Sequence, residues 1–226
     1  MGRNMNCTVS DLFDLKETIA AELFEGVTYP WEVLKQIKEY IVRLGETLDP
    51  QIYEKKGEHV WIAKNATVFP SAYIGDYVII DEDATVRHCA FIRESAIVGR
   101  SSTVGNSTEL KNVVLFNHVE APHYNYVGDS VLGFHAHMGA GSITSNIKAD
   151  RKNILIKSGE EVIETGLRKI GAMLGDYAEI GCNAVLNPGT IVGAHSNVYP
   201  TTCARGVIPA KHILKNDGTL LKKTDV

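Results

Sequence analysis

The feature that most constrains the fold of this chain is an apolar residue at every sixth position. Beginning at Ile62, ten consecutive sixth positions are all aliphatic or Phe. They are Ile62, Val68, Ile74, Ile80, Val86, Ile92, Val98, Val104, Leu110 and Phe116. If about a quarter of positions carry such residues, ten in succession arise by chance on the order of once in a million. The period is therefore a property of the fold.

Small residues occur four places after most of these apolar positions, as at Ala66, Ala72, Ala84 and Ala90. A six-residue period suits neither a helix nor an ordinary strand, but it suits a short strand followed by a corner. Three such units close a triangular coil, with aliphatic side chains inside and small residues at the corners. The pattern resembles the left-handed parallel β-helix of hexapeptide-repeat proteins, an all-β solenoid, over residues 59–210. A β-sandwich with coincidental spacing is the weaker alternative.

The six-residue register is interrupted twice, which predicts two insertions. It breaks at Glu120, resumes at Tyr126 and breaks again in the second half of the chain. We therefore expect insertions near 117–125 and 146–170. The second contains two alternating apolar runs around a Gly-containing turn, which predicts a β-hairpin. Loops outside a rigid scaffold are where functional residues gather.

Residues 8–48 follow a helical period, and we expect an N-terminal helical region over residues 1–58. Apolar residues recur three or four apart in two sets, which predict two amphipathic helices. The sets are Leu12, Leu15, Ile19 and Leu23, then Trp31, Leu34, Ile37, Ile41 and Leu44. Thr8 or Ser10 can cap the first helix, and Pro30 starts the second. Residues 211–226 read as a polar C-terminal tail.

Composition excludes several classes of function. With 44% hydrophobic residues among 226, the chain is too apolar to be disordered. No run approaches the ~18 apolar residues of a membrane span, and the N-terminus has no apolar signal core, so we expect a cytoplasmic protein without membrane contact. A formal net charge of −4 argues against a nucleic-acid partner. The four cysteines form no CxxC pair, which indicates free thiols.

Arg93 and Lys111 are eighteen residues apart, which is one full coil of the predicted β-helix. We expect them to stack on one face, about 4.8 Å apart along the axis. Two stacked cations repel each other unless an anion lies between them, and a phosphate would satisfy both. The alternative is a pair of solvated charges with Glu94 or Glu109 as partners.

His123 lies in the first expected insertion and is a candidate general base, because the pKa of a histidine lies near neutrality. A surface histidine without a role is the alternative. The segment that follows, Met138–Asn146, is rich in glycine. Its backbone N–H groups could bind a thioester oxyanion or a phosphate.

Four ordered motifs carry a resemblance to a known family. They are Val104–Lys111 (VGNSTELK), His123–Asp129 (HYNYVGD), Met138–Asn146 (MGAGSITSN) and Gly166–Ala172 (GLRKIGA). With them the chain resembles the acetyltransferase domain of the bacterial bifunctional N-acetylglucosamine-1-phosphate uridyltransferase. It resembles still more the C-terminal acetyltransferase domain of archaeal-type sugar-1-phosphate nucleotidyltransferases, enzymes of nucleotide-sugar biosynthesis.

The resemblance implies an acyltransferase that moves acetyl from acetyl-CoA to the amine of an amino-sugar 1-phosphate, without a metal. By position, His123 matches the catalytic base, and Glu109 and Asn146 match residues that orient it. The matches to acceptor-binding residues are Arg93, Lys111, Tyr126, His137 and Lys152.

The matches to coenzyme-binding positions are Ala140, Gly181, Cys182 and Tyr199. The family implies a homotrimer with sites between subunits. His137 replaces an Asn of the bacterial enzyme, and Tyr199-Pro200 replaces a small pair near the coenzyme. The first sixty residues are too few for a nucleotidyltransferase domain, so we expect that reaction to need a separate partner protein.

Two other interpretations remain open. His88, His118 and His123 suggest a zinc site like that of β-helical carbonic anhydrases, since three histidines leave one zinc position free for water. A non-catalytic trimeric scaffold is the other, because function depends on sites and not on folds.

Overall fold

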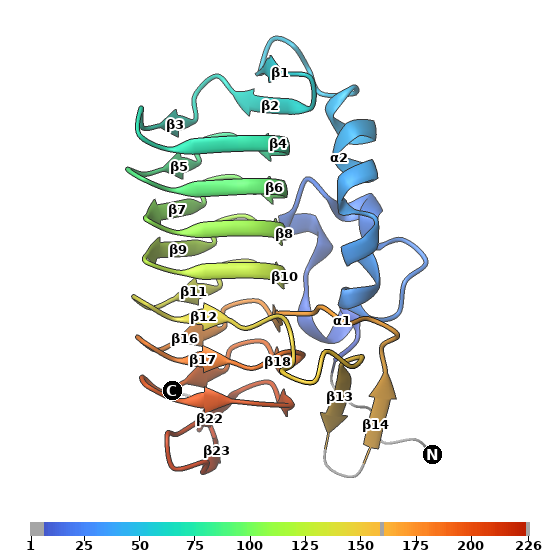
Figure 1. Ribbon diagram of the computed structural model, residues 1–226, viewed down its shortest axis with the longest axis vertical. Coiled ribbons are helices and arrows are strands. Elements are labelled where there is room, and N and C mark those ends of the chain that lie inside the picture. The colour runs from blue at the N-terminus through green and yellow to red at the C-terminus, as the bar shows by residue number, and fades with distance from the viewer. Residues whose placement is uncertain (1–6, 159–160, 225–226) are drawn as a thin grey trace.

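The computed structural model of this chain describes residues 7–158 and 161–224. It is a left-handed parallel β-helix of about eight coils, with an N-terminal segment of short helices along one side (Figure 1). The fold class predicted from the six-residue period is therefore confirmed.

Short parallel strands build one face of the β-helix, which we call the short-strand face. Its strands are β3 (Thr67–Val68), β5 (Thr85–Val86), β7 (Thr103–Asn106), β9 (Glu120–His123), β11 (His137–Met138), β16 (Glu179–Ile180), β19 (Asn197–Val198) and β22 (His212–Leu214). Each pairs with the strand of the next coil, as β7 does with β9. The face is therefore one continuous ladder along the axis.

Longer strands form the other two faces and bend through the corner between them. In the first coils these are β2 (Val60–Ala63), β4 (Tyr73–Ile80), β6 (Phe91–Val98), β8 (Glu109–Leu115) and β10 (Tyr126–Leu132). Further on, the same two faces are built by β12 (Ile143–Thr144), β17 (Val185–Leu186) and β20 (Cys203–Ala204), and by β15 (Ala172–Leu174), β18 (Thr190–Val192) and β21 (Val207–Ile208). At the first end, β1 (Tyr53–Gly57) pairs antiparallel with β2.

The corners are turned by residues in the left-handed region, which L-residues enter singly. One corner column is Asp83, Ser101, His118, His135 and Tyr177, with φ between 55° and 58°. Aromatic members of this column stack on one another, and the rings of His118 and His135 lie 4.7 Å apart. Six-residue units therefore turn without glycine at most corners.

A change of register occurs between β6 and β8. Ile92 lies opposite Leu110, but Glu94 lies opposite Lys111, so Arg93 has no counterpart in the next coil. The coils that contain β8 and β10 are each one residue short. The insertion expected near 117–125 is therefore wrong, because β9 is an ordinary strand of the short-strand face in that region.

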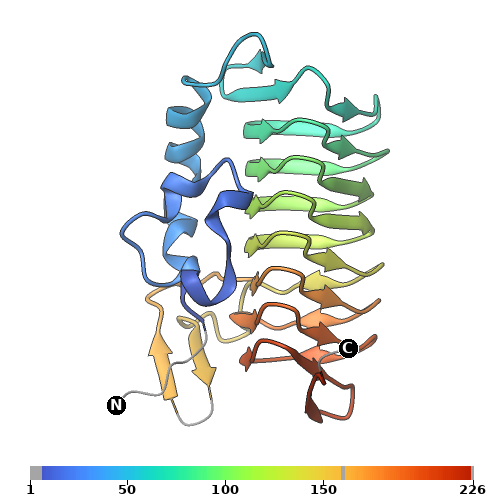
Figure 2. The same cartoon turned by 180° about the vertical axis from the view of Figure 1, so that it is seen from behind.

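The N-terminal segment covers the face formed by the second halves of β4, β6, β8 and β10 (Figure 2). It contains α1 (Val9–Leu12), three 3₁₀ turns at Leu15–Glu17, Ala21–Phe24 and Pro30–Lys35, and α2 (Ile37–Gly45). The Thr8 cap is confirmed, since Thr8 and Asp11 form a reciprocal capping box.

The first long helix predicted from Leu12 to Leu23 is wrong. The segment forms only short helical turns, and part of its backbone bonds to the β-helix. The N–H of Asp176 donates to the Leu12 carbonyl (2.9 Å), and the N–H of Asn117 donates to the Glu17 carbonyl (3.0 Å). Tertiary hydrogen bonds have replaced the helical ones that the apolar spacing suggested.

The second insertion leaves the β-helix after β12 and returns at β15. It contains the hairpin of β13 (Leu155–Ser158) and β14 (Glu161–Glu164), which pair antiparallel. Ile154 and Ile156 are fully buried, so the hairpin is docked against the β-helix and does not extend freely into solvent.

The C-terminal residues are more ordered than the polar tail expected over 211–226. β22 continues the short-strand face, and β23 (Leu220–Lys222) folds back antiparallel on it. No helix among the described residues is long and apolar enough to cross a membrane.

Candidate functional site

His123 ends β9 at a corner of the β-helix, with its side chain exposed. Its backbone N–H donates to Oδ1 of Asn125 (3.1 Å), and its carbonyl accepts from the N–H of Gly141 (2.9 Å). Asn125 is 2% exposed and donates through Nδ2 to the carbonyls of Gly139 (2.9 Å) and Ser142 (3.1 Å). The buried amide therefore fixes His123 against the Gly-rich segment of the next coil.

Asn125 was not among the residues selected from the sequence. It lies inside the motif His123–Asp129, but the reading of that segment as a loop concealed its buried position.

A cleft of about 390 Å³ opens beside His123. It is lined by Arg87, Thr103, Glu120, Pro122, His123, His137, Gly139, Ala140 and Cys182. Four of the residues selected from the sequence thus meet here: His123, His137, Ala140 and Cys182. They come from three successive coils of the short-strand face.

A second cleft, of about 420 Å³, continues along the same face and shares His137, Gly139 and Cys182 with the first. Gly181 and Tyr199, two of the residues expected to bind the coenzyme, line it. A Cβ on Gly181 would overlap the backbone of Pro200, so only glycine fits there. The two clefts form one groove, which we call the short-strand groove.

His137 bridges the two clefts. Its Nδ1 lies 2.9 Å from Oε2 of Glu179, and Glu120 and Glu179 flank it in the parallel register. These two carboxylates were not selected from the sequence. Glu179 places a carboxylate beside the imidazole of His137, and Glu120 lines the same cleft as His123.

A polar cluster lies around the corner from His123 and is centred on Asp129. Oδ1 of Asp129 accepts from Nζ of Lys111 (3.0 Å) and Nδ2 of Asn112 (2.9 Å). Oδ2 accepts from Nδ2 of Asn146 (2.6 Å). Asp129 is 3% exposed, and sequence reasoning missed it because the break in register hid its place at a corner.

Tyr126 joins this cluster, because its hydroxyl accepts from Nδ2 of Asn146 (3.1 Å). Burial raises the pKa of Tyr126, and the nearby charges of Asp129 and Glu109 raise it further. The hydroxyl therefore stays protonated near neutral pH and can donate to a ligand.

The expected stacking of Arg93 on Lys111 is wrong. Lys111 lies opposite Glu94 in the register, and each of the two cations already has a carboxylate partner. Nη1 of Arg93 lies 3.0 Å from Oε1 of Glu109, and Nζ of Lys111 lies 3.0 Å from Oδ1 of Asp129. The arrangement is two neighbouring ion pairs and not a pair of uncompensated charges.

Lys152 stands apart from both groups. It is exposed on the loop before β13, and its backbone N–H donates to Oδ1 of Asp150 (3.0 Å).

The three histidines of the zinc interpretation do not meet. His118 stacks on His135 at a different corner, and His88 packs against the ring of Phe69. Across residues 7–158 and 161–224, no group of three His, Cys, Asp or Glu side chains could hold a metal ion. A three-histidine site is therefore not formed within one chain.

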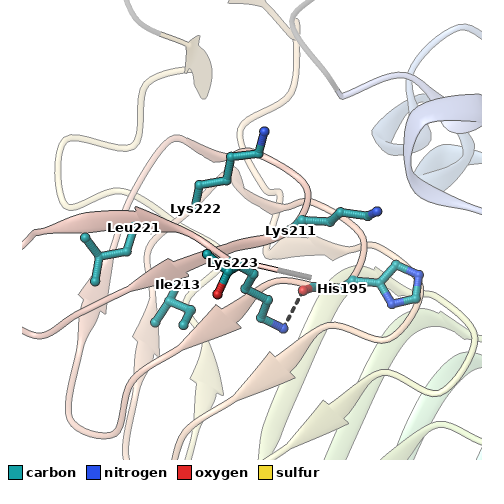
Figure 3. Close-up of a pocket in the computed structure, with 7 residues that line it drawn as sticks. His195, Lys211, Ile213, Leu221, Lys222 and Lys223 are labelled. Atoms are coloured by element: carbon teal, nitrogen blue, oxygen red, sulfur yellow. Dashed lines mark hydrogen bonds between the residues drawn. The ribbon is translucent and has the colours of Figure 1, made fainter. Parts of the chain in front are cut away.

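A third cleft, of about 800 Å³, lies at the C-terminal end of the β-helix (Figure 3). Its lining includes His195, Lys211, Ile213, Leu221 and Lys223. Nζ of Lys223 donates to the carbonyl of His195 (2.6 Å), so this lysine fastens the C-terminal hairpin to the last coils.

Comparison with known proteins finds relatives that are longer than this chain. The Bifunctional protein GlmU of Methanocaldococcus jannaschii is 31% identical in an alignment of 193 residues that covers 76% of this chain and 42% of the relative. A Bifunctional sugar-1-phosphate nucleotidylyltransferase/acetyltransferase of Sulfurisphaera tokodaii is 35% identical over 96 residues, 42% of this chain and 24% of the relative. The chain thus spans less than half the length of these relatives.

Among solved structures, a hexapeptide transferase family protein from Anaplasma phagocytophilum is 16% identical, with a TM-score of 0.42. The match covers 74% of this chain and 82% of that one. No family model matches the sequence. The chain has the fold of a left-handed β-helix built on a six-residue repeat, and its sequence resembles part of the GlmU proteins and of the sugar-1-phosphate nucleotidylyltransferase/acetyltransferases.

Proposed function

We propose that this chain transfers an acetyl group from acetyl-CoA to the amine of an amino-sugar 1-phosphate of the glucosamine-1-phosphate type. The observation that carries the proposal is the common cleft of His123, Ala140 and Cys182, one corner away from Tyr126 and Asn146. A base, a Gly-rich backbone and a polar acceptor cluster are thus adjacent. The similarity to relatives named as acetyltransferases supports the same reaction.

In the proposed reaction, His123 accepts a proton from the acceptor amine as its nitrogen attacks the thioester carbonyl. The backbone amide of Ala140 donates to the oxyanion that forms. Collapse of the intermediate breaks the C–S bond, and the imidazolium returns the proton to the departing thiolate. The products are an amide and coenzyme A.

The short-strand groove is the proposed path of the coenzyme. Gly139 and Gly181 leave the floor of the groove without side chains, so a thin pantetheine chain can lie against the backbone. Tyr199, 42% exposed, lines the same cleft and is the proposed contact at its far end.

The polar cluster is the proposed acceptor site. The Tyr126 hydroxyl and the Asn146 amide would bind sugar hydroxyls, while Glu109 helps to orient the acceptor amine toward His123. Arg93, Lys111 and Lys152 are the proposed phosphate contacts. Because Arg93 and Lys111 are already paired with carboxylates, they would have to exchange part of those contacts for the phosphate.

We also propose a homotrimer, in which a neighbouring subunit completes the open side of the groove, and a separate nucleotidyltransferase that uses the product. Light scattering of the purified protein tests the assembly.

The decisive test of function is thiol release from acetyl-CoA with glucosamine 1-phosphate, galactosamine 1-phosphate and glucosamine as acceptors. Turnover with a phosphorylated amino sugar is expected. Absence of turnover with all three, together with no binding of coenzyme A, would leave a non-catalytic scaffold as the better description.

A further inference from the structure

A separate cleft of about 390 Å³ lies between the β13–β14 hairpin and the last coils of the β-helix. Its lining comes from four segments: Lys148, then Ile154, Leu155 and Lys157, then Asn187, Pro188 and Gly189, and finally Arg205 and Gly206. None of the residues selected for the acetyl-transfer site lines it. The volume is within the range of small-molecule sites.

The charges around this cleft are unbalanced. Lys148, Lys157 and Arg205 line it, and no carboxylate does. Lys148 has Asp150 as a partner (3.3 Å), whereas Lys157 and Arg205 form no ion pair with any residue of the described chain. Basic residues that line one concavity without an acid create a field that attracts anions.

The insertion as a whole also has more basic than acidic residues. Residues 146–170 carry six Lys and Arg and four Asp and Glu, a net charge of +2, in a chain whose formal charge is −4. The insertion is therefore more basic than the chain as a whole.

The hairpin packs closely against the β-helix on its side of the cleft. Ile154 and Ile156 pack over Gly189, where a Cβ would lie 2.6 Å from Ile154 and 2.8 Å from Ile156. The carbonyl of Lys157 approaches Gly206 so closely that a Cβ there would lie 2.9 Å from it. Both glycines have positive φ, which glycine adopts without strain. Their missing side chains also leave room for the hairpin to pack against the β-helix.

From this geometry we propose that the cleft binds the phosphoryl group of a small phosphorylated molecule. The guanidinium of Arg205 and the ammonium groups of Lys157 and Lys148 supply charge-assisted donors, which suit phosphate oxygens. Leu155 and Pro188 give the cleft an apolar wall for the remainder of the ligand. The site does not depend on the proposed acetyl transfer.

Titration calorimetry of the whole chain with pyrophosphate, without acetyl-CoA, tests the proposal. Saturable binding is expected, and Arg205→Gln and Lys157→Gln should each weaken it about tenfold or more, as expected for losing a charge-assisted hydrogen bond. Arg100→Gln is the matched control, because Arg100 is also an exposed arginine but lies outside the cleft and is paired with Glu82 at 2.8 Å. It should leave the affinity unchanged.

Absence of saturable binding, or equal weakening by Arg100→Gln, would overturn the site. Loss of binding in Arg93→Gln but not in Arg205→Gln would place the anion in the polar cluster around Asp129. That result would also overturn the proposed site. Titrations with UMP and glucose 1-phosphate then distinguish a nucleotide from a sugar phosphate, since the tighter ligand at the Arg205-dependent site identifies the class.

Discussion

Oδ2 of Asp129 accepts a 2.6 Å hydrogen bond from Nδ2 of Asn146, which binds the start of the long insertion to the corner of an earlier coil. The backbone of Asp129 binds the other end, because its carbonyl accepts from the N–H of Gly171 (2.7 Å). One buried residue therefore closes the neck of the insertion and orients an amide of the proposed acceptor site.

Asp129→Asn should destabilise the protein by about 3 kcal/mol, the magnitude typical of breaking a buried ion pair. The substitution leaves the Lys111 ammonium, whose side chain is 19% exposed, without its counter-charge. Urea unfolding measures the loss. Asp150→Asn is the matched control, since Asp150 pairs with Lys148 at the surface and its loss should leave stability close to the wild type.

The pair of Lys111 and Asp129 allows a more specific test of why stability is lost. Lys111→Met added to Asp129→Asn should restore part of the lost stability, because no uncompensated charge then remains. A double variant less stable than Asp129→Asn alone would mean that the carboxylate acts through Asn112 and Asn146 and not through Lys111.

His123→Ala should lower kcat by about 100-fold or more while leaving the unfolding temperature unchanged, because the side chain is exposed and acts as a base. Thiol release from acetyl-CoA measures the rate. His135→Ala, another exposed corner histidine on the stacked column, is the control and should retain the wild-type rate. Comparable rates for wild type and His123→Ala would exclude His123 as the base.

The sequence predicted the inward series correctly through Leu110 and lost it afterwards for a physical reason. Val113, Val114, Leu115 and Phe116 are all fully buried, because aromatic residues of the N-terminal segment cover the outside of this face. The ring of Phe116 lies 5.0 Å from that of Phe13. A six-residue pattern cannot detect a missing residue where both sides of a strand are apolar.

For the same reason, the sequence predicted some residues of the candidate site and missed others. His123 and Ala140 were identified by their motifs and Cys182 by its position in the resemblance, and the three residues meet in one cleft. Asn125 and Asp129 lie in the motif His123–Asp129 and are buried beneath the site. They act through hydrogen bonds between coils. Such partners follow from the register, and the register was misread at Arg93.

Arg93→Gln should raise KM for glucosamine 1-phosphate about tenfold and leave KM for unphosphorylated glucosamine unchanged. Arg93 is 44% exposed and paired with Glu109, so its removal should affect binding more than folding. Steady-state kinetics with both acceptors measures the difference. An equal change for the two acceptors would show that Arg93 does not bind the phosphate.

Gly105→Ala should destabilise the β-helix strongly, by about 3 kcal/mol or more, because a buried clash forces the backbone to move. A Cβ at Gly105 would overlap the carbonyl group of Pro122 on the next coil. Gly57→Ala is the control, since its Cβ would make an ordinary 3.4 Å contact with Val60. If both variants unfold at the same temperature, the coils have more room than the structure indicates.

Asp176 should make stability fall as pH rises from about 4 to 7. Its carboxylate accepts from the backbone N–H groups of Asp14 (2.7 Å) and Phe134 (2.8 Å), and it joins the N-terminal segment to the β-helix. Burial, at 9% exposure, raises the pKa of Asp176 to about 6 despite these two bonds.

The direction follows from proton binding. Between the ordinary pKa of an aspartate and 6, the folded state holds a proton that the unfolded state has released, so raising the pH favours unfolding. The full effect is about 3 kcal/mol, from about 1.4 kcal/mol for each pKa unit. It is measured as the free energy of unfolding of the wild type minus that of Asp176→Asn at pH 4, 5, 6 and 7. That difference should decrease by the stated amount as Asp176 ionises, whereas parallel pH profiles for the two proteins would show that Asp176 ionises equally easily in both states.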